Sequence, residues 1–338
     1  MHPKRTPLIA LATLSAAALL PAAGSAQDAV TLDPVILSAG FAPQAADAYG
    51  RAATVLTAAE IEARGIATVQ DALRAVPGVS VSSAGTSFTQ VRIRGAEASH
   101  SLILIDGIEV AGGGDEYVLT GLETANIDRI EVLRGPQSVY YGSNASAGVI
   151  NIITRGGEPG LHYGGGIELG NGAAASAHVS RNGERGGLAL NLSARDDHGF
   201  DLSGDGGEKD GIHRKTLGLS GWVQATDALR LGATLRRSWE RYDSDALATY
   251  DFLTGGYVDA EGNPVTGPEG YVNDDPALFG KRDERQGALW AEFASLDGRL
   301  THRLDYQDSV FKQNNEGAGW TTGKTRKLKY RGLSLIHI

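Results

Sequence analysis

Residues 129–155 have the sequence RIEVLRGPQSVYYGSNASAGVINIITR, and this stretch decides which fold the chain takes. Two strand-like runs, 130–133 and 149–154, flank a segment of small, hydroxyl-bearing residues. Such a segment could be an ordinary turn, a phosphate-binding loop or part of a compact domain that moves. A phosphate-binding loop needs Gly-Lys-Ser/Thr before a helix, whereas here Gly148 leads into a strand. The stretch therefore favours a β-rich domain over a nucleotide-binding one.

An enzyme is the least favoured function class. The sequence shows no nucleophile next to a general base, and a dinucleotide fingerprint fails because no helix follows the glycines. We therefore predict no catalytic residue and no required cofactor. The acidic net charge of −9 also disfavours a nucleic-acid partner.

The first 26 residues have the three parts of a secretory signal peptide. Lys4 and Arg5 precede the apolar run 8–20, and Gly24-Ser25-Ala26 form a small-residue cleavage site before Gln27. The alternative is a mature N-terminal helix. Cleavage would remove two positive charges and take the net charge from −9 to −11. We expect an exported protein, and the absence of cysteine means that disulfides do not stabilise it.

Residues 50–157 are predicted to form a mixed α/β domain. The segment TAAE at 57–60 is a capping-box pattern for one short helix, and Thr68 is a candidate N-cap for a second. The dipeptide Asp106-Gly107 predicts a tight turn after the apolar run 102–105. The preceding residues, 27–49, show no sustained period and are expected to be a mobile segment.

After residue 157, apolar and polar residues alternate in runs of about ten, the length of a tilted membrane-spanning β-strand. Short connections at 182–185 and 226–228 alternate with the long segments 196–212 and 243–284. This asymmetry is typical of an outer-membrane β-barrel. A soluble β-sandwich is the alternative, but one face carries arginines that a sandwich core would not accept unpaired: Arg230, Arg236, Arg299 and Arg303.

The number of strands has a further implication. We expect about eight strands in residues 158–338, whereas a barrel wide enough to hold a separate domain needs about 22. The fold class is therefore an N-terminal α+β plug followed by a transmembrane antiparallel β-barrel, of which only the first part is present. The expectation is a C-terminally truncated chain.

Several motifs in order resemble the plug of TonB-dependent outer-membrane receptors, and of cobalamin- and siderophore-receptor-like members in particular. They are VRIRG at 91–95, LILIDG at 102–107, IEVLRGP at 130–136 and YGSNASAGVINIITR at 141–155. The resemblance implies an outer-membrane location in a Gram-negative bacterium. It also implies import of a scarce nutrient chelate, driven by proton-motive force through TonB with ExbB and ExbD.

The resemblance also assigns a TonB box, the segment that pairs with TonB as an added β-strand. The segment DPVILSA holds the matching position, although Pro34 removes one backbone donor. Its residues are Asp33, Pro34, Val35, Ile36, Leu37, Ser38 and Ala39. A plain linker is the alternative.

Three further groups of candidate residues follow. Arg92, Arg94, Arg134 and Arg155 are predicted to contact carboxylates of the barrel wall. Ser87, Phe88, Asp115 and Tyr117 are candidates for ligand contact. Loop carboxylates are predicted to hold a structural calcium ion, because calcium prefers oxygen ligands from flexible loops. They are Asp196, Asp197, Asp201, Asp205, Asp210, Asp243 and Asp245.

The sequence leaves two questions of function open. An energised importer competes with a passive outer-membrane porin or adhesin, neither of which needs a plug with a TonB box. The ligand could be a ferric siderophore, cobalamin, haem or a carbohydrate.

Overall fold

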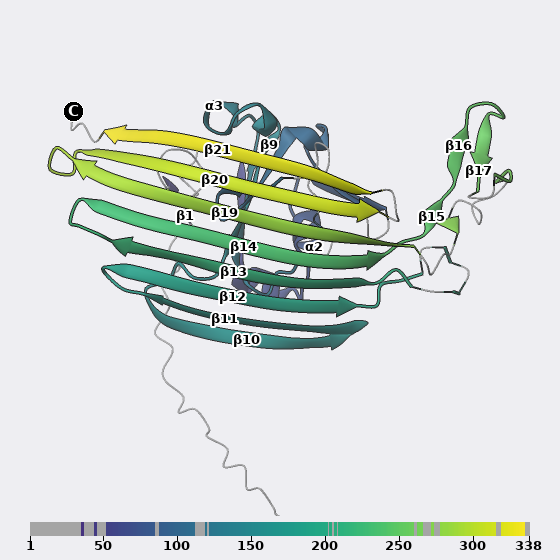
Figure 1. The fold of residues 1–338 in the computed structure, drawn as a ribbon, viewed down its shortest axis with the longest axis horizontal. Coiled ribbons are helices and arrows are strands. Elements are labelled where there is room, and N and C mark those ends of the chain that lie inside the picture. Colours follow the sequence, from purple (N-terminus) through teal and green to yellow (C-terminus); the bar gives the residue numbers. More distant parts are fainter. Residues whose placement is uncertain are drawn as a thin grey trace, which may run out of the picture. The chain divides into compact units, whose positions relative to one another are not determined.

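The computed structural model describes residues 35–36, 44–45, 52–84, 88–111, 119, 122–201, 203–204, 206–207, 209–259, 262–265, 272–273, 278–315 and 319–334 (Figure 1). All of them belong to one compact unit, residues 34–338. The predicted signal peptide lies outside the described residues. Within those residues, no helix is both long and apolar enough to cross a membrane.

A five-stranded sheet forms the centre of the first domain, which we call the plug. The strands lie in the order β3 (Ala53–Thr57), β8 (Ile127–Arg134), β9 (Gly148–Thr154), β6 (Ser101–Ile105) and β7 (Ile108–Glu109). All neighbours are antiparallel except β6 and β9, which are parallel. Strands β6 and β9 are almost wholly buried, in keeping with their mainly apolar sequences.

Two short helices cover this sheet, and the hydrophobic core lies between the helices and the sheet. In α1 (Ala58–Ala63) the Thr57 hydroxyl accepts the Glu60 N–H, and the Glu60 carboxylate accepts the Thr57 N–H, so the predicted capping box is present. Helix α2 (Val69–Arg74) begins at the predicted cap Thr68. The core packs helix residues against strand residues: Ile61, Val69, Leu73, Ile103, Ile130, Val132, Ile150 and Ile152. The hairpin of β4 (Val79–Ala84) and β5 (Phe88–Ile93) and the short helix η1 (Ala98–His100) complete this side of the plug.

The connection inside residues 129–155 is a compact turn. It contains α3 (Ser138–Tyr141) and the short helix η2 (Ser143–Ala145). Gly142 between them has φ +96°, a conformation that favours glycine. The Gln137 N–H donates to the Ala145 carbonyl at 2.9 Å, so the turn folds back on itself and buries Ala145. The small residues thus allow two strands of one sheet to be joined closely.

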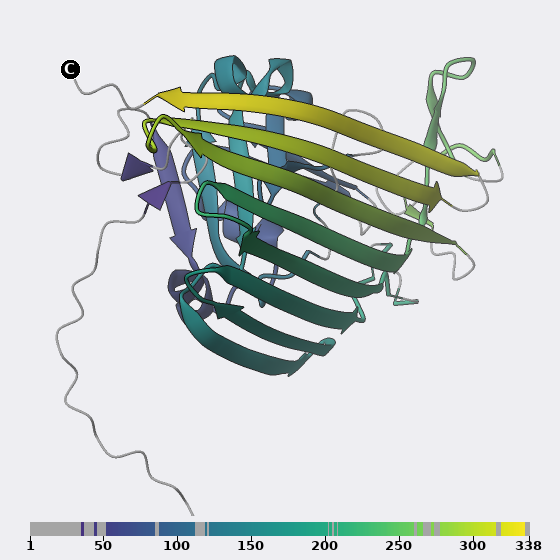
Figure 2. The same cartoon turned by 60° about the vertical axis from the view of Figure 1, so that its left-hand side comes forward.

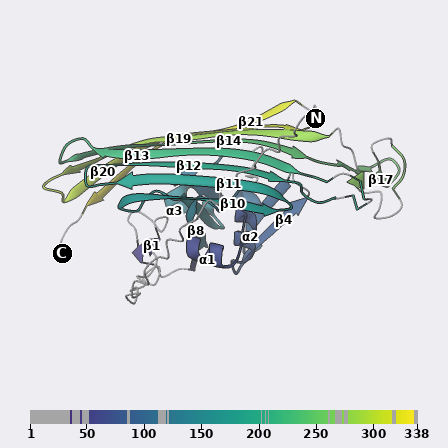
Figure 3. The same cartoon turned by 90° about the horizontal axis from the view of Figure 1, so that it is seen from below.

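The second domain, which we call the wall, is an antiparallel meander of eight strands in sequence order. They are β10 (Gly160–Gly170), β11 (Gly172–Asn182), β12 (Gly186–Asp197), β13 (Ile212–Gln224), β14 (Leu229–Asp243), β19 (Phe279–Ser295), β20 (Leu300–Asn315) and β21 (Trp320–Ser334). The predicted number of strands is confirmed. The sheet is curved, and the plug lies on its concave side (Figures 2 and 3).

The connections have the predicted asymmetry. The connections 183–185, 225–228 and 296–299 at one end of the wall are short, and the long segments 198–211 and 244–278 begin at the other end. Asn171, which joins β10 to β11 at that second end, is the exception. The segment 244–278 contains short strands: β15 (Ala246–Leu247), β16 (Thr249–Asp251), β17 (Gly256–Val258) and β18 (Val272–Asn273). Arg299 lies in a short turn, where its Nε donates to the Leu296 carbonyl, so its predicted place on the inner face is wrong.

The two faces of the wall differ in chemistry, as the alternation predicts. On β14 the side chains of Leu231 and Leu235 are exposed on the convex face, whereas Arg236, Ser238 and Glu240 are buried on the concave face. The same two-residue period places Leu289 outside and Gln286 inside on β19.

Candidate functional site: the plug–wall interface

Neutral hydrogen bonds join the plug to the wall at several points. The Ala111 N–H donates to Ser309 Oγ at 3.0 Å, and Gln307 Nε2 donates to the Gly107 carbonyl at 3.2 Å. A third bond runs from Asn126 Nδ2 to the Leu192 carbonyl at 2.7 Å. Backbone groups of the plug thus meet side chains of β20, and a plug side chain meets the backbone of β12.

Ion pairs across the interface place carboxylates on the plug and bases on the wall. Glu123 Oε1 lies 3.2 Å from Arg195 Nε of β12, and Glu109 pairs with Lys327 of β21. Arg331 of β21 donates to the Tyr140 hydroxyl at 2.6 Å. Arg195 and Glu123 are largely buried. Since separating a buried pair leaves an uncompensated charge, the two pairs fix where the plug sits against the wall.

The arginines predicted to bridge plug and wall lie elsewhere. Arg92 donates to Ser82 and Gln90 of its own hairpin, and Arg134 donates to the Pro77 carbonyl at 2.6 Å and to Thr54. Arg155 pairs with Glu62, and Arg94 lies beside Gly78 and Gly135. The described contacts of these side chains are therefore within the plug. The prediction that these arginines contact the wall is corrected because carboxylates, amides, hydroxyls and carbonyls of the plug lie nearer to them than the wall does.

Sequence reasoning missed the residues that make the bridging ion pairs. Glu109 and Glu123 stand alone in plug loops and at a strand end, with no local pattern to mark them. Lys327 shares the inner face of β21 with Thr325 and Lys329, two positions away on either side. This two-residue period was the available sign that Lys327 faces the plug.

A second inner-face feature that was missed is a buried charge network on three adjacent strands. Arg214 of β13 lies 2.7 Å from Glu240 of β14 and 3.3 Å from Glu284 of β19. Arg236 and Arg282 extend the network through Glu284 and Glu240. These side chains are at most 6% exposed. In this network each buried charge is paired with an opposite one, which offsets the cost of burial.

A small cavity of about 50 Å³ lies between plug and wall. It is lined by Asp106, Glu123 and Asn126 of the plug and by Asn191 and Arg236 of the wall. Four polar atoms at this cavity are buried and have no protein hydrogen-bond partner among the described residues: Glu123 Oε2, Asn126 Oδ1, Asn191 Oδ1 and Arg236 Nη2. A polar cavity of this size can hold ordered water that would bond to these atoms.

Asp106 makes the plug sensitive to pH. Its carboxylate accepts the Thr154 N–H at 2.8 Å and the Thr154 hydroxyl at 2.9 Å. Burial raises the pKa of Asp106, although Thr154 and the charge of Arg236 oppose the rise. A raised pKa means that the carboxyl group stabilises the fold below its unfolded-state pKa and that this stability is lost as pH rises through the folded-state pKa.

We expect Asp106→Asn to remove this pH dependence. The amide can still accept from the Thr154 N–H and can donate to the hydroxyl, so the hydrogen bonds survive without a buried charge. The melting temperature of the variant should exceed that of the parent chain at pH 7.5, and the difference should shrink at pH 4. Thermal melts at both pH values measure it. A constant difference would contradict the assignment.

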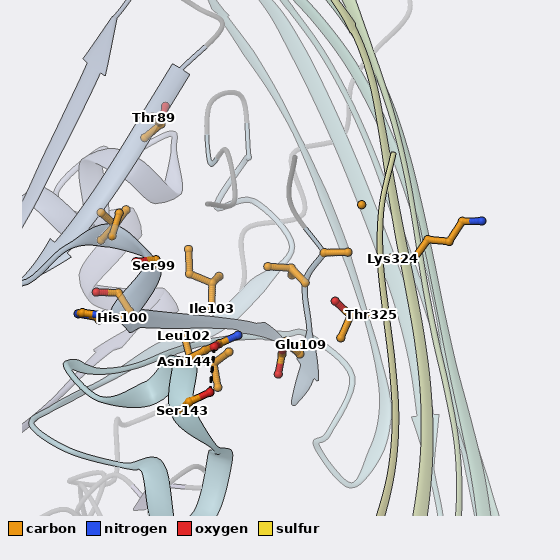
Figure 4. A pocket seen from close by; sticks show the side chains of 16 residues that line it. Thr89, Ser99, His100, Leu102, Ile103, Glu109, Ser143, Asn144, Lys324 and Thr325 are labelled. Atoms are coloured by element: carbon orange, nitrogen blue, oxygen red, sulfur yellow. Dashed lines mark hydrogen bonds between the residues drawn. The ribbon is translucent and has the colours of Figure 1, made fainter. Parts of the chain in front are cut away.

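The candidate ligand residues fall mainly outside the described part of the chain. Ser87, Asp115 and Tyr117 are not described, and only the backbone of Phe88 is, at the start of β5. A cavity of about 510 Å³ lies near this hairpin, between the plug and β21 (Figure 4). Thr89, His100, Glu109 and Asn144 line it from the plug. The ligand contacts stay a prediction.

The candidate calcium ligands are dispersed in the described loops. Asp196 lies 3.0 Å from His213, and Asp197 accepts the Gly199 N–H. Asp201 accepts from Ser203, Gly204 and Gly206, and these hydrogen bonds lower its pKa. Asp210 and Asp245 are buried, Asp243 lies 3.4 Å from Arg241, and Asp205 is not described. No group of three ligands forms among the described residues. The calcium site stays a prediction.

A mixed α/β plug on the concave side of an antiparallel wall, with a polar inner and an apolar outer face, defines the class. It is the plug-and-barrel fold of outer-membrane receptors. Residues 46–149 match the model of the TonB-dependent receptor plug domain, so this part of the chain is a plug domain of that family.

Known proteins agree with this assignment. A segment of 135 residues is 36% identical to the vitamin B12 transporter BtuB of Vibrio vulnificus (strain YJ016), covering 38% of this chain and 22% of the transporter. The fold matches the unliganded ferric citrate transporter FecA with a TM-score of 0.64 at 19% identity, covering 85% of this chain and 45% of that one. The ferric yersiniabactin uptake receptor FyuA of Yersinia pestis matches with a TM-score of 0.60 at 16% identity, covering 86% and 46%. The chain thus spans less than half the length of these relatives.

Proposed function

We propose that the protein imports a scarce nutrient chelate across the outer membrane, driven by TonB-coupled movement of the plug. The observation that carries the proposal is the plug–wall interface. A few ion pairs and scattered hydrogen bonds hold the folded domain against the inner face of the wall, around a small polar cavity. The hydrogen bonds and the partly exposed Glu109–Lys327 pair can exchange with water at modest net cost. The buried Glu123–Arg195 pair is the costliest contact that a displaced plug must break and the one that favours its return.

The position of the TonB box supports the coupling to TonB. Val35 and Ile36 form β1, which pairs only with the two residues of β2 (Gln44–Ala45) among the described strands. A two-residue pairing is weak, so the segment can exchange it for a strand of a partner. We propose that residues 33–39 bind TonB by this strand addition, with ExbB and ExbD supplying the proton-motive force.

The ligand we favour is cobalamin, with a ferric siderophore as the second candidate. The first choice rests on the 36% identity to a vitamin B12 transporter. The structural matches to iron-chelate receptors lie at 16–22% identity and support the fold alone.

Uptake by the full chain in matched strains tests the proposal. The host lacks its own receptors for both ligands and either carries or lacks TonB. We expect accumulation of radiolabelled cyanocobalamin only in the strain with TonB, and collapse of the proton-motive force should stop it. Accumulation that is equal in both strains would instead support the passive porin. Accumulation of a labelled ferric siderophore alone would replace cobalamin as the ligand.

A further inference from the structure

A cavity of about 670 Å³ lies between plug and wall near the short turns, and its volume is in the range of small-molecule sites. Asp106, Tyr140 and Asn151 line it from the plug. Trp222 and Arg230 line it from the two wall strands that the short turn 225–228 joins. Short turns of outer-membrane barrels face the periplasm. This cavity, which we call the short-turn cavity, is therefore at the periplasmic end of the interface.

Two tryptophan rings of the wall have fixed positions in the short-turn cavity. Trp222 Nε1 donates to Asn182 Oδ1 at 3.1 Å. Glycines stand opposite both rings on the neighbouring strands, Gly187 opposite Trp222 and Gly232 opposite Trp290. A Cβ atom at Gly187 would lie 2.5 Å from Trp222 Nε1, and one at Gly232 would lie 2.3 Å from the Trp290 ring. The two glycines therefore leave the space that the rings occupy.

Arg230 lies against these rings and forms no ion pair with any described residue. Its guanidinium carbon is 3.7 Å from the centre of the Trp222 ring and 5.7 Å from that of Trp290. Glu292 is opposite Arg230 in the register but pairs with Arg303 at 3.5 Å. Arg230 Nε is buried without a hydrogen-bond partner among the described residues. The aromatic rings thus hold a guanidinium whose N–H donors can bind an anion.

The other charges on the wall side of this cavity leave an excess of positive charge. Asp305 lies 2.9 Å from Arg303 and 3.1 Å from Arg331, so one carboxylate serves two arginines. Lys329 forms no ion pair in the described part of the chain, and its ammonium group lies 5.7 Å from the centre of the Tyr141 ring. The wall side thus carries four basic and two acidic side chains: Arg230, Arg303, Lys329, Arg331, Glu292 and Asp305. An anion from outside the chain would balance this excess.

We propose that the short-turn cavity binds an oxyanion of the imported chelate, a phosphodiester or a carboxylate, with Arg230 as the principal contact. The arginine fork matches the two oxygens of either group, and the tryptophan rings hold it in place. At the periplasmic end, the oxyanion would meet Arg230 after the plug has moved and before the ligand leaves the wall. The inference deepens the proposed import and rests on it.

Binding of small anions by the full chain in a phosphorus-free detergent tests the site without transport. The probes are dimethyl phosphate, acetate and inorganic phosphate, and the readout is the broadening of their NMR lines by the protein. We expect saturable broadening of dimethyl phosphate and acetate, and the tighter of the two identifies the group as phosphodiester or carboxylate. If neither broadened, or inorganic phosphate alone did, the site would not be one for the chelate. This comparison needs no variant.

Substitutions locate the site. In Arg230→Gln we expect the affinity for the tighter probe to fall by about tenfold, since a charge-assisted hydrogen bond is lost. Arg230→Lys keeps the charge without the fork and should recover part of the affinity. The matched control is Arg181→Gln, which removes an exposed arginine next to another short turn. Unchanged affinity in Arg230→Gln, or an equal loss in Arg181→Gln, would refute a site at Arg230.

Uptake by cells separates this inference from the proposed function. We expect uptake of labelled cyanocobalamin by Arg230→Gln to fall several-fold while binding at the cell surface stays at the parent level. The loss should be smaller for dicyanocobinamide, which lacks the phosphodiester. Equal uptake of cyanocobalamin by parent and variant would overturn the role of the short-turn cavity alone. Absence of uptake by the parent chain would overturn the proposed import, whatever the anion probes show.

Discussion

We expect uptake to fall to the level of a strain without TonB when residues 31–40 are deleted, whereas ligand binding at the cell surface should stay at the parent level. This is the largest functional effect that we expect from any change outside the plug. The reason is that strand addition requires the backbone N–H and C=O groups of this segment, while the plug and wall contain none of these residues. Uptake and surface binding of labelled cyanocobalamin are measured on the same cells.

A point variant refines this result. Ile36→Pro removes one backbone donor and fixes φ, so it should also abolish uptake, whereas Ile36→Val leaves the backbone unchanged and should retain it. If uptake persisted in both the deletion and the proline variant, energised transport through this segment would be disproved. The outcome would then favour a passive barrel.

Gly148→Val should prevent the plug from folding, and it is the substitution with the largest structural effect that we expect. A Cβ atom at Gly148 would lie 2.2 Å from the Leu133 carbonyl oxygen and 2.8 Å from Ile93 Cδ1. The first is a backbone atom of β8, which pairs with β9 at this point. Since the backbone cannot move without breaking the sheet, we expect a loss of about 3 kcal/mol or more.

Protease sensitivity of residues 50–157 and the plug's thermal melt measure the effect. Gly157→Ala is the matched control, because a Cβ there meets no atom within 4 Å. Gly142→Ala is intermediate: its Cβ also has open space, but φ of +96° strains any other residue by about 1–3 kcal/mol. A folded, protease-resistant Gly148→Val plug would show that β8 and β9 are not packed as described.

The two glycines therefore have different roles. The sequence alone suggests that both keep the turn mobile, so that bulky replacements would impair transport and spare binding. In the structure, Gly142 permits a backbone conformation and Gly148 permits close packing of two strands. Loss of ligand binding in Gly148→Val would thus follow from an unfolded plug.

Local signals in the sequence predicted the elements well. Thr57 and Thr68 cap their helices as predicted. Each cap depends only on a hydroxyl and the backbone N–H three residues later, so a short stretch of sequence is enough to predict it. Asp106 and Gly107 both have positive φ and join β6 to β7, as the Asp-Gly pair predicts. The two-residue period of the wall strands fixed which face is apolar.

Contacts between distant segments could not be predicted in the same way. Glu109 and Lys327 are 218 positions apart, and Glu123 and Arg195 are 72 apart. Their pairing depends on how the plug is seated, which no local pattern encodes. The four plug arginines looked like bridging residues because they are charged and close to strands, but nearer partners in the plug engage them.

The edge position of β3 determines how the plug responds to mechanical tension. This strand follows the N-terminal segment directly and has a single neighbour, β8, in the five-stranded sheet. Tension applied across the strands would separate the pairs one at a time, from Ala53 and Leu133 to Thr57 and Arg129. Sequential rupture needs far less force than breaking all pairs together. A pull at the N-terminus can therefore detach one strand while β8, β9 and β6 remain paired.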